Sequence, residues 1–263
     1  MFNLNTMEIS QFNKARYTDA PYFAAIKASG ECLTQVLCES LRAIHHCTLI
    51  PILVHGGGKQ IDAALKEHGF ETKKINGRRI TDKQTLDVVV ATLHNINRQF
   101  VSDINSVDYI AQGLTRIFYA KGMDPVYGYV SDVTGLDTQS INACLHERLI
   151  PVICSLGIDP QGHYYNINAD SAFKYLVYTL KPMKVIFLTS TCGVLKEDEL
   201  IHEMNHLELQ DFINSRYVTG GMKLKLVEAA ELLEHGFDVQ ITSPEHLLRN
   251  LFSSKGYGTY LKH

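Results

Sequence analysis

The sequence predicts an α/β protein: a three-layer αβα sandwich with a mainly parallel central sheet. Apolar runs of five or six residues alternate along the chain with longer segments whose apolar residues recur every three to four positions. The short runs show little polar–apolar alternation, which is typical of strands buried on both faces. Strands that alternate with helices favour parallel pairing with helices on each side of the sheet. In such folds ligands bind at the carboxyl ends of the strands.

The predicted elements alternate between strand and helix. The predicted strands are Tyr22–Ile26, Leu49–Val54, Arg116–Ala120, Ile150–Cys154, Lys184–Thr189 and Phe237–Ile241. Helical periodicity runs from Leu33 to Ile44, Ile61 to His68, Leu86 to Ile96, Ile141 to Leu149, Phe173 to Leu180 and Leu226 to Leu233. Hairpin excursions are expected at 71–82, with a turn at Asn76-Gly77, and at 121–136. We expect a polar extension at residues 1–20, followed by one folded domain over 21–263.

Composition and charge exclude several classes of protein. The 263 residues carry 25 Lys and Arg against 28 Asp and Glu, a formal net charge of −3. This balance, without dense basic runs, argues against nucleic-acid binding. No apolar stretch is long enough to span a bilayer, so no membrane partner is expected. None of the six cysteines forms a CxxC pair, and most lie in apolar stretches. We therefore expect buried, reduced thiols in a cytoplasmic protein.

Three consecutive glycines, Gly56, Gly57 and Gly58, follow one predicted strand directly and precede a helix. Without Cβ atoms the backbone can approach an anion closely, at a point where a helix N-terminus offers unpaired N–H groups. The stretch is therefore a candidate anion-binding loop. The alternative is a tight turn that binds nothing.

Further polar groups follow the other predicted parallel strands, so they should gather at the same edge of the sheet. They are Lys27 and Gly30, the turn Asp159–Gly162 leading to Asn166, Asn168 and Asp170, the segment Thr189–Gly193, and the helix start Thr219–Lys225. Glycine-rich turns, helix N-termini and two lysines suit polyphosphate and carboxylate ligands.

Lys27 and Lys225 are candidates to neutralise charge during phosphoryl transfer, which needs positioning and charge stabilisation more than covalent help. Two ammonium groups aimed at one site repel, so an anion or a carboxylate such as Asp170 is required between them. Simpler alternatives are solvated surface lysines, Asp170 as a helix cap, and Asn166 and Asn168 as turn residues.

Several sequence blocks, in a fixed order, carry a resemblance to a known family. They are Ala25–Gly30 (AIKASG), Val54–Gly58 (VHGGG), Gly77–Asp82 (GRRITD), Tyr165–Asp170 (YNINAD), Gly220–Lys225 (GGMKLK), Leu251-Phe252 and Gly256–Thr259 (GYGT). With them, residues 20–262 resemble the amino-acid kinase family, and within it the N-acetylglutamate kinases. The C-terminal segment is most similar to the kinase domain of two-domain acetylglutamate synthase/kinase proteins. The GxxxxGK[ST], GxGxxG, HRD and DFG motifs are absent.

The resemblance implies the amino-acid kinase fold and ATP-dependent phosphorylation of the side-chain carboxylate of N-acetyl-L-glutamate to an acyl phosphate, a step of arginine biosynthesis. The implied catalytic residues are Lys27 and Lys225, which stabilise charge, and Asp170, which holds both lysines. The implied acid-binding residues are Gly57, Gly58, Arg79 and Asn166. The implied nucleotide-binding residues are Lys27, Gly30, Thr189, Ser190, Gly193, Gly221 and Lys225. Mg²⁺ is implied as a cofactor held mostly by phosphate oxygens, with no metal site made of protein ligands.

The resemblance also implies two lobes, approximately 21–182 for acetylglutamate and 183–263 for ATP, in a homodimer or higher homo-oligomer. The chain departs from the family pattern at four positions: Ser29 and Lys59 in the glycine loops, Ser190 on the nucleotide side, and Asn250 before Leu251-Phe252. Two other functions stay open. One is an arginine-sensing, catalytically weak kinase-like domain, and the other is a kinase for a different amino acid or carbamate.

Overall fold

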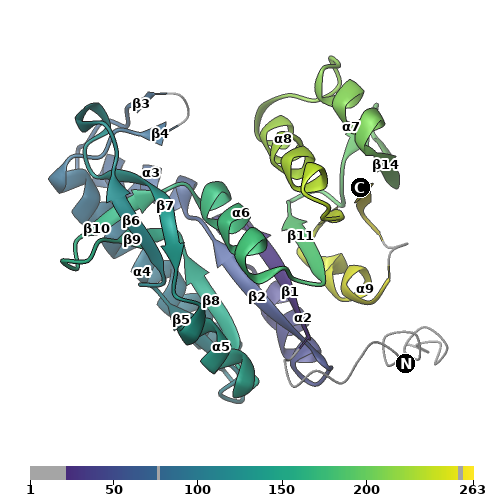
Figure 1. Cartoon of the computed structure of the whole chain (residues 1–263), viewed down its shortest axis with the longest axis horizontal. Helices are drawn as coiled ribbons and strands as arrows, with labels where there is room; N and C mark the ends of the chain where they lie inside the picture. The colour runs from purple at the N-terminus through teal and green to yellow at the C-terminus, as the bar shows by residue number, and fades with distance from the viewer. Residues whose placement is uncertain (1–21, 76–77, 254–256) are drawn as a thin grey trace.

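The computed structural model describes residues 22–75, 78–253 and 257–263. An eight-stranded sheet runs through its centre (Figure 1). In spatial order its strands are β14 (Glu203–Asn205), β16 (Thr259–Lys262), β15 (Val239–Thr242), β11 (Lys184–Leu188), β1 (Tyr22–Ala28), β2 (Leu49–His55), β8 (Ile150–Cys154) and β5 (Ala111–Leu114). The predicted extension at 1–20 and the predicted turn at Asn76-Gly77 lie outside the described residues.

Adjacent strands of this sheet are parallel except for the β15–β16 pair. In the register, Lys27 of β1 lies opposite Val54 of β2 and Phe187 of β11, so these strands end at the same edge. This edge is where the sequence predicts the ligand site. The prediction of a mainly parallel sheet is confirmed.

Helices cover both faces of the sheet, as predicted (Figure 1). The described helices are α2 (Gln35–His45), α3 (Gly58–Glu67), α4 (Lys83–Ile104), α5 (Thr138–His146), α6 (Ala169–Leu180), α7 (His206–Ile213), α8 (Gly220–Glu234) and α9 (Leu247–Phe252), with 3-10 turns η1 (Gly30–Cys32), η2 (Pro125–Tyr127) and η3 (Pro244–His246). Within β1, Ala24 and Ile26 face one apolar cluster, with α2, α4 and α9, whereas Ala25 faces the other, with α5 to α8. Both faces are apolar because both are buried.

A second β structure lies beside the main sheet. Four strands close into a small barrel: β10 (Tyr164–Ile167), β7 (Val130–Leu136), β6 (Phe118–Gly122) and β9 (Leu156–Ile158). The strand predicted at Arg116–Ala120 overlaps β6 and belongs to this barrel. The edge of the main sheet is instead β5, whose Gln112 and Gly113 interrupt the apolar pattern that would have revealed a strand.

The segment between Val194 and Ile213, for which the sequence yields no prediction, forms short pairs and one helix. β12 (Leu195–Lys196) pairs with β13 (Glu199–Leu200), and β14 leads into α7. The predicted hairpin at 71–82 is present as β3 (Lys74–Ile75) and β4 (Arg78–Arg79). In Figure 1 this hairpin and α8 lie at the upper edge of the molecule, on either side of α6. Among the described residues no helix is long and apolar enough to cross a membrane.

Candidate active site at the carboxyl edge of the sheet

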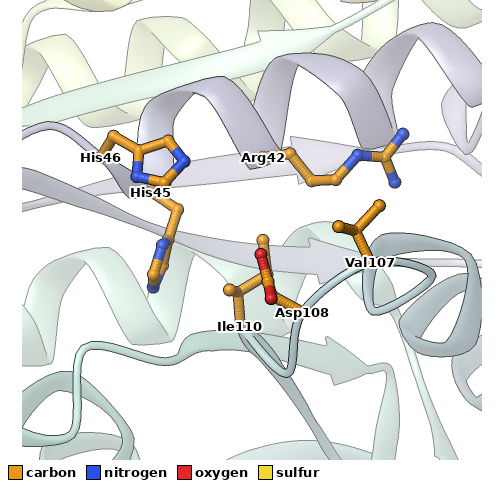
Figure 2. Close-up of a pocket in the computed structure, with 6 residues that line it drawn as sticks. All are labelled: Arg42, His45, His46, Val107, Asp108 and Ile110. Carbon is orange, nitrogen blue, oxygen red and sulfur yellow. The ribbon is translucent and has the colours of Figure 1, made fainter.

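The candidate site is built on the loops that follow β1, β2, β10 and β11. A cavity of about 150 Å³ at the opposite edge, near the start of β2 and β5, is a separate feature (Figure 2). There Arg42 donates through Nη1 to the carbonyls of Asp103 and Ile104, at 2.8 and 3.4 Å, and thereby satisfies the end of α4. Arg42 therefore has a structural role at this cavity. Lys27 and the glycine loop after β2, which the sequence predicts for the site, lie at the carboxyl edge of the sheet, and we place the chemistry there.

The glycine loop after β2 is fixed by tight packing. Gly57 is the N-cap of α3, and a Cβ there would come within 2.7 Å of Ile96 Cδ1 on α4. A Cβ on Gly56 would come within 3.2 Å of Ala169 Cβ, next to the start of α6. Gly58 is exposed and has open space around it. Gly56 and Gly57 thus let two helices approach, whereas Gly58 leaves the α3 N-terminus open to an anion.

A hydrogen-bonded pair behind this loop was missed at the sequence level. His55 lies 3.1 Å from the Gly56 carbonyl through Nδ1, and Asn97 Nδ2 lies 3.0 Å from His55 Nε2. Asn97 also donates to the Val152 carbonyl at 2.9 Å. Since an amide N–H can only donate, Nε2 accepts and Nδ1–H donates to Gly56. Burial lowers the pKa of His55 to about 4, so the ring is neutral at pH 7 and serves as a fixed support.

Ser29 and Lys59, the two departures in the glycine loops, fit without strain. Ser29 is the N-cap of η1 with φ −72° and ψ 159°, an extended conformation open to any residue. Lys59 Nζ pairs with Glu31 Oε1 at 2.5 Å and thereby joins the loop after β1 to the start of α3. A Cβ on Gly30 would come within 2.3 Å of the Gln60 carboxamide, so a larger residue would have to displace that side chain where the two loops meet.

Lys27, the predicted catalytic lysine of β1, is buried and forms an ion pair with Asp170 in the first turn of α6. Asp170 is not the cap of this helix: Asn168 Oδ1 accepts from the N–H groups of Asp170 and Ser171, at 2.7 and 3.1 Å. The capping alternative for Asp170 is therefore wrong, and Asn168 has that role. The Asp170 carboxylate faces Lys27 instead.

Lys225 lies on α8, near enough to Lys27 for the two charges to interact. Burial is the main cause that lowers the pKa of Lys27 to about 8, Glu228 opposes the shift, and the charge of Lys225 adds to it. Lys225 is half-buried, and no ion pair joins it to Asp170 in the described part of the chain. That Asp170 holds both lysines therefore stays a prediction, with only its pair to Lys27 observed.

Glu228, three residues after Lys225, is a carboxylate that sequence reasoning missed. Burial raises its pKa, against the opposing charges of Lys27, Lys174 and Lys225. The only signal for Glu228 in the sequence is its spacing of i+3 from Lys225, which places both side chains on one face of a helix.

Thr81 links the side chain of Asn166 to the backbone of Arg79, the two residues predicted to bind the acid through their side chains. The Thr81 hydroxyl donates to the Arg79 carbonyl at 2.8 Å and accepts from Asn166 Nδ2 at 3.1 Å. Thr81 is fully buried and was assigned no role from sequence, although it lies in the GRRITD block. The structure thus connects Asn166 of β10 to the β4 segment that carries Arg79.

One edge of the Arg79 guanidinium is anchored by protein. Nη1 pairs with Asp62 Oδ1 at 2.6 Å and donates to Thr72 Oγ1 at 3.0 Å. Burial acts to raise the pKa of Asp62, but hydrogen bonds and charge from Arg79, with Lys74 and Thr72, hold it below its usual value. Asp62 is thus ionised at pH 7 and orients a guanidinium whose remaining N–H groups can bind a carboxylate.

The predicted nucleotide-side residues form a more open group. Thr189 is buried, and its N–H donates to the Thr242 carbonyl at 2.9 Å, whereas Ser190 is exposed. Gly193 packs tightly, because a Cβ there would lie 2.8 Å from Thr259 Oγ1. Gly220 (φ 58°) and Gly221 begin α8 with open space around them.

Asn250, the departure near the C-terminus, is a structural anchor. It is 2% exposed, and Nδ2 lies 2.7 Å from Thr242 Oγ1, 2.9 Å from the His246 carbonyl and 3.2 Å from the Tyr257 carbonyl. These contacts tie α9 to the end of β15. Among the described residues no cluster of three or more His, Cys, Asp or Glu could hold a metal ion.

Comparison with known proteins agrees with this geometry. A protein of Xylella fastidiosa (strain 9a5c) named acetylglutamate kinase is 37% identical over 270 residues, which cover 98% of this chain and 64% of that protein. The chain thus spans less than two thirds of that relative. A protein of Psychrobacter cryohalolentis with the same name is 32% identical, over 90% of this chain and 88% of its own length.

Solved structures share the fold. The crystal structure of smu.665 from Streptococcus mutans UA159 superposes with a TM-score of 0.78 at 27% identity, over 91% of this chain and 98% of that one. N-acetylglutamate synthase from Neisseria gonorrhoeae gives a TM-score of 0.83 at 18% identity, over 99% of this chain and 64% of that one, a similarity of fold alone.

The family comparison covers most of the chain. The model of the amino acid kinase family matches residues 23–243, a span that holds both lysines, both glycine loops and the Arg79–Thr81–Asn166 group. The match agrees with the mainly parallel sheet described above. The chain therefore belongs to the amino acid kinase family.

Proposed function

We propose that the protein is an N-acetylglutamate 5-kinase, which transfers the γ-phosphoryl group of ATP to the side-chain carboxylate of N-acetyl-L-glutamate. The observation that carries the proposal is the buried Lys27–Asp170 pair at the carboxyl edge of the sheet, within electrostatic reach of Lys225. Lys27 and Lys225 would stabilise charge on the transferred group, and Asp170 would orient Lys27. The names of the relatives support the same activity.

The acceptor acid is proposed from the group around Arg79. Its guanidinium, held at one edge by Asp62, would bind the α-carboxylate of the acid through its other N–H groups. Asn166, placed by Thr81, would hydrogen-bond the N-acyl group. The N–H groups of Gly57 and Gly58 would bind the reacting carboxylate and phosphoryl group. We accordingly assign residues 21–182 to the acid and residues 183–263 to ATP.

The nucleotide would lie against the second lobe. Thr189, Ser190, Gly193 and Gly221 would line its site, with Gly30 and both lysines near the phosphates. The open start of α8 fits a polyphosphate, because a helix N-terminus favours negative charge. Mg²⁺ would be held mainly by the phosphate oxygens of the nucleotide. Assembly into a homodimer or higher homo-oligomer and a cytoplasmic location belong to the same proposal.

An acyl-phosphate assay tests the function. Hydroxylamine converts an acyl phosphate to a hydroxamate, so ATP is supplied with N-acetyl-L-glutamate, glutamate, aspartate or bicarbonate with ammonia, and each product is quantified. We expect hydroxamate from N-acetyl-L-glutamate at a kcat/KM at least about a hundredfold above that for glutamate. Turnover of another acid at a higher kcat/KM would identify a different kinase. No turnover of any acid, together with arginine binding, would identify a sensor domain.

A further inference from the structure

Helices α6 and α8 face each other with charged side chains between them. On α8, Lys225, Glu228 and Glu231 are spaced three residues apart, so they share one helix face. That face points toward α6, because Glu231 forms an ion pair with Lys174 of α6. Lys174 is one turn after Asp170, the partner of Lys27. The charged row on α8 therefore runs beside the pair predicted to be catalytic.

Two ion pairs form in this region, and Lys225 and Glu228 belong to neither of them. Lys27 is paired with Asp170, and Lys174 is paired with Glu231. In the described part of the chain, neither Lys225 nor Glu228 belongs to an ion pair. Lys225 and Glu228 lie one turn apart on the same helix, and each interacts electrostatically with Lys27. Glu228 is thus the carboxylate available to balance Lys225.

The Glu228 side chain is half-buried, and one oxygen of its carboxylate is enclosed by the protein without a hydrogen bond. Its Oε2 has no hydrogen-bond partner among the described residues. A buried ionised oxygen without such a bond is costly unless nearby charges compensate. Three ammonium groups, on Lys27, Lys174 and Lys225, supply that compensation. A purely structural role would not require a carboxylate at this position among the lysines of the candidate site.

We propose that Glu228 is a positioning residue whose carboxylate balances the Lys27 and Lys225 ammonium groups and keeps them directed at the same site. This inference rests on the proposed function for its role in turnover, but its electrostatic part is independent of it. The groups that face Glu228 are Lys27 from β1, Lys174 from α6, and Lys225 and Glu231 from α8, with Asp170 and Cys32 beside Lys27. Burial and the charge of Lys225 lower the pKa of Lys27, and without the Glu228 carboxylate less would oppose that shift.

The test is Glu228→Gln, which keeps the size of the side chain and removes its charge. The Lys27 ammonium should then lose its proton at a lower pH, by about one unit. Two readouts follow it: the alkaline limb of kcat/KM in the hydroxamate assay, and the rate at which acetic anhydride acetylates Lys27 at each pH, measured on the Lys27 peptide by mass spectrometry. We expect kcat to fall about tenfold with an unchanged KM for the acid.

Glu231→Gln is the matched control, because it makes the same change one turn further along the same face of α8. Its partner is Lys174, so neither readout should move. In Glu228→Asp, which retains the charge, the pH at which Lys27 is half deprotonated (the Lys27 midpoint) should lie close to that of the unchanged protein. A Glu228→Gln protein whose Lys27 titrates as in the unchanged protein would overturn the inference. A shifted Lys27 midpoint in a protein that phosphorylates no acid would refute the proposed function and leave the electrostatic role of Glu228 standing.

If Glu228→Gln does not fold, a double-mutant cycle of Glu228→Met and Lys225→Met decides. Paired charges predict that the double variant unfolds at a higher temperature than Glu228→Met alone, because no unpaired ammonium group is then left in the cluster. A double variant no more stable than Glu228→Met would overturn the inference.

Discussion

The two halves of the candidate site differ in how firmly the protein holds them. On the side proposed to bind the acid, Arg79, Asn166 and the glycine loop are fixed by an ion pair to Asp62 and by partly buried hydrogen bonds through Thr81 and His55. On the nucleotide side, Ser190 and Gly221 are exposed, and the start of α8 has open space around it. The half proposed to bind the acid is therefore held by contacts within the protein, whereas the half proposed to bind the nucleotide is more open. Mutations should accordingly affect the two halves differently.

The largest effect is expected on the open side. Lys225→Ala should lower kcat about a thousandfold or more, because the ammonium group acts mainly on charge that develops in the transition state. Because Lys225→Ala also leaves Glu228 without its balancing charge, the thermal unfolding temperature is measured alongside, so that kcat is compared between folded proteins. Single-turnover and steady-state rates with N-acetyl-L-glutamate check this. A kcat within threefold of the unchanged protein would remove Lys225 from the mechanism.

The next effect concerns the support behind the glycine loop. The pKa of His55 is lowered to about 4 by burial, so protonation is disfavoured in the folded state. This contribution is fully present above the unfolded pKa of about 6.5 and is lost as pH falls toward 4, a change on the order of 3 kcal/mol. Urea unfolding between pH 7 and 4 measures it.

His55→Gln provides the comparison for that measurement. Its free energy of unfolding should vary less with pH over the same window, because glutamine takes up no proton. Equal pH dependence in the two proteins would show that His55 is not the group responsible. Asn97→Asp, which offers a carboxylate to the ring, should move the His55 titration to higher pH.

A moderate effect is expected at Arg79. Arg79→Ala should raise the KM for N-acetyl-L-glutamate about 10- to 100-fold and leave the KM for ATP unchanged, because a charge-assisted hydrogen bond to the α-carboxylate is lost. Asp62→Asn should raise the same KM less, since it only frees one edge of the guanidinium. Initial rates at varied acid concentration separate the two. An unchanged KM in Arg79→Ala would place the carboxylate elsewhere.

The smallest effect is expected at Lys59, which tests whether charge near the glycine loop matters by itself. Its pair with Glu31 is exposed, with side-chain exposures of 75% and 50%. Lys59→Ala should therefore change the free energy of unfolding by less than about 1 kcal/mol and the KM for ATP by less than threefold. A large rise in the KM for ATP would show that Lys59 binds phosphate directly.

The fold was predictable where local pattern and burial agree. Strands such as Leu49–His55, buried on both faces, and helices with a single apolar stripe were recognised from periodicity. The edge strand β5 and the barrel strands β9 and β10 were not, because each is only three or four residues long. Short strands are specified by tertiary contacts more than by their own residues.

The candidate site was predictable to the extent that its residues lie in compact motifs. Lys27, Asp170, Arg79 and Asn166 were identified because blocks of recognisable sequence surround them. Their supporting partners were not, since a hydrogen bond such as that between Asn97 and His55, 42 residues apart, leaves no pattern in the chain. Glu228 was missed for a related reason: a glutamate on a helix is expected to be solvated, and only the packing of α6 against α8 shows that its Oε2 is enclosed.

The most direct measurement is a crystal structure with a non-hydrolysable ATP analogue and N-acetyl-L-glutamate bound. The account predicts that the Nζ atoms of Lys27 and Lys225 both lie within about 3 Å of oxygens on the terminal phosphoryl group or its bridging atom. It also predicts that Asp170 stays paired with Lys27. A complex in which either ammonium group points away from the phosphoryl group, toward another surface, would contradict it.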